Sequence, residues 1–175
     1  MRLAALVLGV GLSLGLCCSS RAALAFEREW HLGVGAGASN GNGLKLSPAV
    51  AAYAAYGLSD VFDARVELTA RGYHLGQEQN PNAVSAMAGV AYKLDVLRWV
   101  PWAGVYAGYL GFLEQPPAAS VFKRHDLALG LGLGLDYAFT RKFGVGLTLR
   151  FDQALGRSEA STFDALLRAE YRWGW

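Results

Sequence analysis

The side chains best suited to acid–base chemistry in this chain are three separated histidines, His31, His74 and His125. His125 precedes Asp126 and forms the only adjacent pair of a histidine and an acid. A hydrolase or acyltransferase would also need a serine held beside a base, and Ser120 and Ser161 lie in polar stretches without a surrounding motif. The histidines lack metal-ligand spacing. We therefore expect no enzyme activity, no catalytic residue, no metal site and no cofactor.

Most other charged side chains stand at alternate positions. In residues 62–72 an acidic, basic or hydroxyl side chain follows every alanine, valine or leucine. Residues 126–137 alternate in the same way, with leucine at every second position from Leu127 to Leu135. The opposite parity holds only aspartate, alanine and glycine. A period of two indicates a β-strand with unlike faces. Apolar residues outside and small or charged residues inside are typical of a transmembrane barrel strand.

Eight segments of this kind follow one another. They are predicted at about residues 30–38, 46–56, 62–72, 83–94, 99–112, 126–137, 144–152 and 163–175. The facing of the second and fifth is ambiguous, because alanine, glycine and aromatic residues occur on both parities. Short turns at 57–60, 95–98 and 140–142 alternate with longer loops, as in outer-membrane barrels, whose short turns are periplasmic. Aromatic residues, Trp102 among them, gather near the short turns and predict a ring at the periplasmic interface.

A soluble barrel that binds a ligand would show the same alternation with its faces exchanged. Three features favour the membrane form. The apolar parity is unbroken on six of the eight segments, the opposite parity is rich in glycine, and the aromatics cluster at strand ends. The hydrophobic content of 53% and charged content of 17% fit this interleaving.

The N-terminus has the features of a secretory signal peptide. Arg2 precedes the apolar run Leu3–Leu16, and Ala23-Leu24-Ala25 fits a cleavage site. We expect residues 1–25 to be removed and residues 26–175 to form the barrel domain. A retained anchor and lipidation at Cys17 are the alternatives. Cleavage would remove both cysteines and leave a formal net charge of zero, which gives no reason to expect a nucleic-acid partner.

The C-terminus carries the most specific signal. Leu167, Ala169, Tyr171, Trp173 and Trp175 alternate up to the last residue, and residues 100–109 combine Pro101 with aromatics and glycines. With these features, residues 26–175 resemble the small eight-stranded outer-membrane barrels of Gram-negative bacteria, the OmpA/OmpX-like group. The resemblance implies an all-β, eight-stranded antiparallel up-and-down transmembrane β-barrel without a peptidoglycan-binding domain. It also implies that Tyr171, Trp173 and Trp175 form an assembly signal for the barrel-assembly machinery. Trp175 departs from the phenylalanine more usual there.

A barrel of eight strands has an interior that side chains can fill. The inward parity predicts a charge network in the lumen, made by Asp63, Arg65, Glu67, Arg71, Asp126, Asp136, Arg150, Asp152, Asp164, Arg168, Glu170 and Arg172. Charges removed from bulk water must pair. A simple hairpin register places Arg150 near Asp164, and it sets Gly33, Gly35 and Gly37 opposite Arg172, Glu170 and Arg168. We therefore expect a plugged lumen and a structural or surface-interaction role, in a monomer whose other partner is outer-membrane lipid. The alternatives are a narrow pore for small solutes and a lipid-modifying enzyme.

Overall fold

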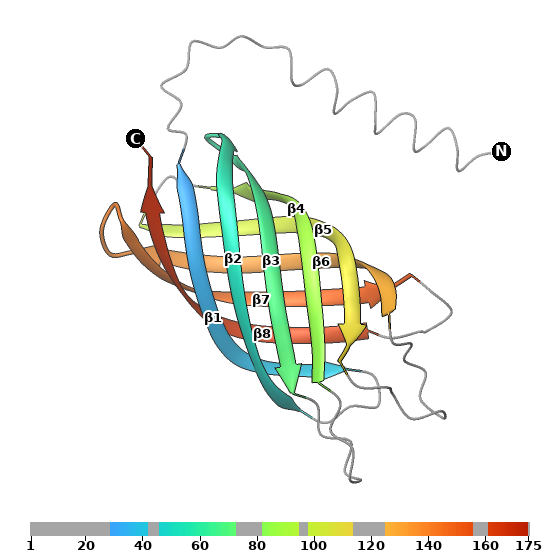
Figure 1. The fold of residues 1–175 in the computed structure, drawn as a ribbon. Helices are drawn as coiled ribbons and strands as arrows, with labels where there is room; N and C mark the ends of the chain where they lie inside the picture. The colour runs from blue at the N-terminus through green and yellow to red at the C-terminus, as the bar shows by residue number, and fades with distance from the viewer. Residues whose placement is uncertain are drawn as a thin grey trace, which may run out of the picture.

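The computed structural model describes residues 29–41, 46–72, 82–94, 98–113, 125–155 and 161–174. Within these ranges the strands are β1 (Trp30–Gly41), β2 (Ser47–Ser59), β3 (Phe62–Gly72), β4 (Asn82–Lys93), β5 (Trp99–Phe112), β6 (His125–Ala138), β7 (Phe143–Ala154) and β8 (Ser161–Trp173). Neighbours in sequence pair antiparallel, and β1 pairs with β8, so the barrel is closed (Figure 1). The predicted all-β, up-and-down architecture is confirmed. The predicted signal peptide, residues 1–25, lies outside the described residues.

The two faces of the wall are distributed as a membrane barrel requires. Leu131 and Leu133 on β6 are each 59% exposed on the outside, whereas Arg71 and Arg150 are 1% exposed inside. A water-soluble barrel would have the opposite arrangement, because uncovered leucines and buried charges are both unfavourable in water. The soluble alternative is therefore excluded. No helix in the described part of the chain is long and apolar enough to cross a membrane.

Aromatic rings form a belt of three contacting groups at the end of the barrel where β1 begins and β8 ends. The belt includes Trp30 with Tyr56 at 4.8 Å between ring centroids, and Phe143 with Tyr171 at 5.0 Å. Such rings are favoured at a membrane interface, where one edge is apolar and the other is wet. The prediction that Trp102 belongs to this belt is wrong, because Trp102 points into the lumen and is 4% exposed.

The structure also settles the strands whose facing the sequence leaves open. On β2, Tyr53 and Ala55 are buried inside and Val50 and Ala52 face outward. On β5, Trp102, Tyr106 and Leu110 point inward, and Trp99, Val105 and Tyr109 point outward. Both barrel faces are thus assigned along these two strands.

Candidate functional site: the barrel lumen

The lumen is occupied by side chains in successive layers. In the layer nearest the long loops, Arg71 of β3 reaches across the interior. Its Nε donates to Asp164 Oδ1 of β8 at 2.9 Å, and its Nη2 donates to Asp152 Oδ2 of β7 at 3.0 Å. Its Nη1 donates to Ser85 Oγ of β4 at 2.8 Å. One guanidinium therefore ties four strands together across the barrel.

Arg150 of β7 forms the next layer. Its Nε donates to Asp152 Oδ1 at 2.8 Å, and its Nη1 forms an ion pair with Glu67 Oε1 of β3 at 2.5 Å. The guanidinium also lies 4.6 Å from the centroid of the Tyr106 ring of β5. Asp152 thus joins the Arg71 and Arg150 layers through its two carboxylate oxygens.

The middle of the lumen is aromatic as well as charged. The guanidiniums of Arg65 and Arg168 lie 4.1 Å and 4.8 Å from the centroid of the Trp102 ring, and Arg168 also lies 4.5 Å from that of Tyr53. Arg168 Nη2 donates to both oxygens of Asp136 at 2.7 Å. Among the described residues, Nε and Nη1 of Arg65 and of Arg168 have no hydrogen-bond acceptor. The aromatic ring faces therefore replace part of the favourable hydration that these two guanidiniums lose inside the lumen.

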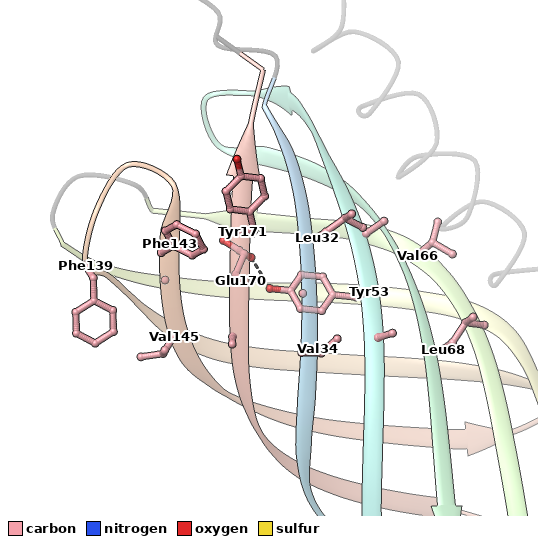
Figure 2. Close-up of a pocket in the computed structure, with 15 residues that line it drawn as sticks. Leu32, Val34, Tyr53, Val66, Leu68, Phe139, Phe143, Val145, Glu170 and Tyr171 are labelled. Atoms are coloured by element: carbon pink, nitrogen blue, oxygen red, sulfur yellow. Dashed lines mark hydrogen bonds between the residues drawn. The ribbon is translucent and has the colours of Figure 1, made fainter.

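The layer nearest the short turns is built around Glu170 of β8. Tyr53 Oη donates to Glu170 Oε2 (Figure 2), Arg172 Nε donates to Oε1, and His31 Nδ1 lies 3.1 Å from Oε1. The other ring nitrogen of His31 lies 3.5 Å from Glu29 Oε2, just before β1. This interaction with His31 lowers the pKa of the Glu29 carboxyl. The imidazole therefore bridges two carboxylates at the barrel mouth.

The structure places the predicted charge network inside the wall. Asp126 is half-buried near the long loops, and the others are buried: Asp63, Arg65, Glu67, Arg71, Asp136, Arg150, Asp152, Asp164, Arg168, Glu170 and Arg172. Arg150 lies opposite Asp164 in the β7–β8 register, as a simple hairpin predicts, but it forms ion pairs with Asp152 and Glu67. Arg150 thus pairs along its own strand with Asp152 and across the lumen with Glu67, not with the residue opposite it in the hairpin.

One predicted register is wrong by two residues. Gly33, Gly35 and Gly37 of β1 were expected opposite Arg172, Glu170 and Arg168, but they lie opposite Glu170, Arg168 and Leu166. The β1–β8 pairing joins the two ends of the barrel domain, so no turn fixes its register. It is set instead by the stagger of strands that closes the barrel. The stagger cannot be read from the spacing of residues along the sequence.

Sequence reasoning also missed the aromatic part of the lumen. Trp102 and Tyr106 share their parity with Gly104 and Gly108, and glycine marks the inner face on other strands. The shared parity with glycine is therefore a sequence signal from which the inward position of Trp102 and Tyr106 could have been predicted. Gly132 and Gly134 of β6 lie under these rings, so the glycines make space for aromatic side chains as well as for charges.

The predicted assembly residues lie at the end of β8. Tyr171 is 40% exposed on the outer wall, where its ring lies 5.8 Å from that of Trp173. Trp175 lies outside the described residues. The candidate catalytic residues are only partly described. His74 and Ser120 lie outside the described ranges, as does the side chain of His125. Ser161 begins β8 at the long-loop end, far along the barrel from His31.

A closed eight-stranded wall with an apolar exterior and a charged interior defines the chain as an integral outer-membrane β-barrel. No family model matches the chain, and no curated protein matches it in sequence. Solved structures do. The chain is similar to neisserial surface protein A, NspA, at 15% identity and a TM-score of 0.66, over 83% of this chain and 97% of that one.

Two further outer-membrane barrels have the same fold. The N-terminal barrel of Pseudomonas aeruginosa OprF matches at 14% identity and a TM-score of 0.61, over 85% of this chain and 99% of that one. Ail, the attachment invasion locus protein of Yersinia pestis, matches at 17% identity and a TM-score of 0.53, over 84% and 99%. At these identities the likeness concerns the fold, and function has to be argued from this chain's own residues.

Proposed function

We propose that this protein is a monomeric, non-enzymatic outer-membrane barrel with a structural or surface-interaction role, and that its lumen is closed to solutes. The observation that carries the proposal is the set of arginines that cross the lumen in layers. Arg71, Arg150 and Arg168 each contact carboxylates or rings on strands from other parts of the barrel. A solute would have to displace all these layers in turn.

The energy of such a displacement supports a closed lumen. Removing one partner from a buried ion pair costs roughly 3–5 kcal/mol, because the other charge is left unpaired. Arg71 alone has three partners, and its side chain is fully buried. Opening a path through several layers at once is therefore unfavourable without an external driving force.

Planar-bilayer recording tests the closed lumen. We expect the purified protein to show no channel events at neutral pH. Trp102→Ala, which removes the indole from the middle layer, serves as the sensitised variant and should conduct if it still inserts. Regular single-channel steps from the unmodified protein would contradict the proposal and favour a narrow pore. Heat-modifiable migration on gels checks that each sample holds a folded barrel.

The non-enzymatic part of the proposal has a separate test. His31 is engaged by Glu170 and Glu29 at the short-turn end, and Ser161 begins β8 at the opposite end. These two residues therefore do not form a nucleophile and its base. We expect lipid A from cells with and without the protein to give identical mass spectra. A modified lipid A species that depends on the protein would favour the enzyme alternative.

We also propose that the end of β8 is the signal read by the barrel-assembly machinery. The support is the alternation that ends in Tyr171, Trp173 and Trp175, together with the outward position of Tyr171. Deleting Trp175 should lower the amount of heat-modifiable barrel in the membrane fraction. Deleting a residue from the 156–160 segment is the matched control for chain shortening. Equal losses in both would contradict a specific signal.

A further inference from the structure

The outer wall of the barrel contains an open apolar groove. It has a volume of about 650 Å³ and lies where β3, β2, β1, β8 and β7 pass side by side (Figure 2). Leu32, Val34, Val66 and Leu68 line it on one side, and Phe139 and Phe143 line its other end. Because this wall faces the hydrocarbon, the groove is a feature of the surface that lipid touches.

Strand register explains why the wall is hollow here. Two rows of paired residues cross the five strands. One row is Leu68, Ala52, Val34, Ala169 and Val145, and the other is Val66, Ala54, Leu32, Tyr171 and Phe143. Alanine occupies three of the four positions beside the central β1 residues Val34 and Leu32, and Tyr171 occupies the fourth. Larger side chains stand at the outer ends of both rows. The alanines are the low positions, or floor, of this wall, and Val34 and Leu32 of β1 rise between them. The outer leucines, valines and aromatics form the rim.

One end of the groove adjoins a cationic turn. Phe139 and Phe143 flank the turn between β6 and β7, and Arg141 and Lys142 are exposed between them. The backbone of Arg172 donates from its N–H to the Lys142 carbonyl at 2.8 Å, which fixes this turn against β8. The groove thus continues directly from apolar rings to two positive charges at the membrane interface.

The dimensions of the groove suit one hydrocarbon chain. Four spacings between five strands cover roughly 19 Å. A lipid chain that reaches the middle of a hydrocarbon core about 30 Å thick extends for roughly 15 Å. The groove is long enough for the chain, and its cationic end lies where a headgroup would be.

We propose that this groove binds one anionic phospholipid, with an acyl chain over Ala52, Ala54 and Ala169 and the phosphate beside Arg141 and Lys142. The site belongs to the leaflet at the short-turn end. A second copy of the barrel fits less well, because two convex walls meet at their protruding side chains and leave a recessed floor uncovered. The inference goes beyond the proposed function and does not depend on whether the lumen conducts.

Native mass spectrometry of the detergent-solubilised barrel tests the proposal, with dioleoyl phosphatidylglycerol and dioleoyl phosphatidylcholine as probes. We expect one phosphatidylglycerol to be retained in preference to phosphatidylcholine. A basic residue near an anionic lipid surface contributes about fivefold in affinity, so Arg141→Ala with Lys142→Ala should reduce this preference by roughly 10- to 30-fold. Arg98→Ala, an exposed cation on the β4–β5 turn, is the control and should leave the preference unchanged.

A second pair of variants tests the chain slot. Ala52→Leu with Ala169→Leu fills the floor and should weaken retention of both lipids about tenfold or more. Ala107→Leu is the control, because Ala107 is also exposed on the outer wall but lies on β5, away from the groove. Unchanged retention in the filled variant would overturn the proposal. So would equal competition by the deacylated headgroup, or a dimer that the filled variant abolishes. Heat-modifiable migration verifies that each variant is folded.

Discussion

At the scale of single residues, the most connected side chain of the outer layer is Arg71. Its guanidinium satisfies Asp152, Asp164 and Ser85, which come from three other strands. Two carboxylates this close would repel each other if the cation were absent. Arg71 therefore neutralises charge that the barrel cannot expose to bulk water, and its loss should affect folding more than the loss of a surface cation.

Replacing Arg71 with methionine should destabilise the barrel by roughly 3–5 kcal/mol, because Asp152 and Asp164 stay buried without their cation. Urea unfolding in micelles, followed by tryptophan fluorescence, measures the change. Adding Asp164→Asn should restore part of the lost stability, since one uncompensated charge is removed. Arg98→Ala, on an exposed turn, should change stability by less than about 0.5 kcal/mol. Equal effects of Arg71→Met and Arg98→Ala would contradict this role.

At the scale of elements, β5 and β6 fit together through size complementarity inside the lumen. The pairs Trp102–Gly134 and Tyr106–Gly130 alternate large with small across the two strands. A Cβ atom at Gly134 would overlap the Trp102 indole, and one at Gly132 would lie 3.0 Å from Tyr106 Cε2. The glycines of β6 thus position the rings on which Arg65, Arg150 and Arg168 lie.

Gly134→Ala should therefore destabilise the barrel by roughly 1–3 kcal/mol through overpacking. Thermal unfolding of the two proteins in the same detergent measures the difference. Gly72→Ala at the end of β3 is the matched control, because its Cβ would be no closer than 3.7 Å to a neighbouring atom. Combining Gly134→Ala with Trp102→Leu should couple non-additively. Additive effects would show that the indole is not the obstacle.

At the scale of the whole molecule, the barrel is an inside-out protein with its leucines outside and its ion pairs inside. Leu131 lies near the middle of β6 and is 59% exposed, whereas Leu58 lies near the β2–β3 turn and is 50% exposed. The exposed fraction alone predicts a similar cost for a charge at these two positions. Their different depths in the bilayer predict different costs, because a charge is most unfavourable at the midplane.

Leu131→Arg should cost about 2–4 kcal/mol and Leu58→Arg about 0–1 kcal/mol. Unfolding in lipid vesicles is the appropriate measurement, because micelles do not reproduce the depth profile of a bilayer. The wild-type barrel in the same vesicles is the reference. A barrel that tolerated both substitutions equally would not have its β6 leucines in the hydrocarbon.

The sequence by itself determined the number of strands, their approximate limits and the face on which most side chains lie. These follow from local rules: alternation has a period of two, and turns carry recognisable residues. Asp63, Arg65, Glu67 and Arg71 on β3 could be placed inside from their parity alone.

Only the tertiary structure decided which charges meet. Arg71 reaches Asp164, 93 residues away in the chain, and Arg150 reaches Glu67 rather than the opposing Asp164. The closure register of β1 with β8 was likewise absent from the local pattern. Contacts across a lumen depend on the stagger of the whole barrel and on the lengths of individual side chains. The alternation in β6 thus predicted a glycine face inside, and the fold showed that the Trp102 and Tyr106 rings lie over it.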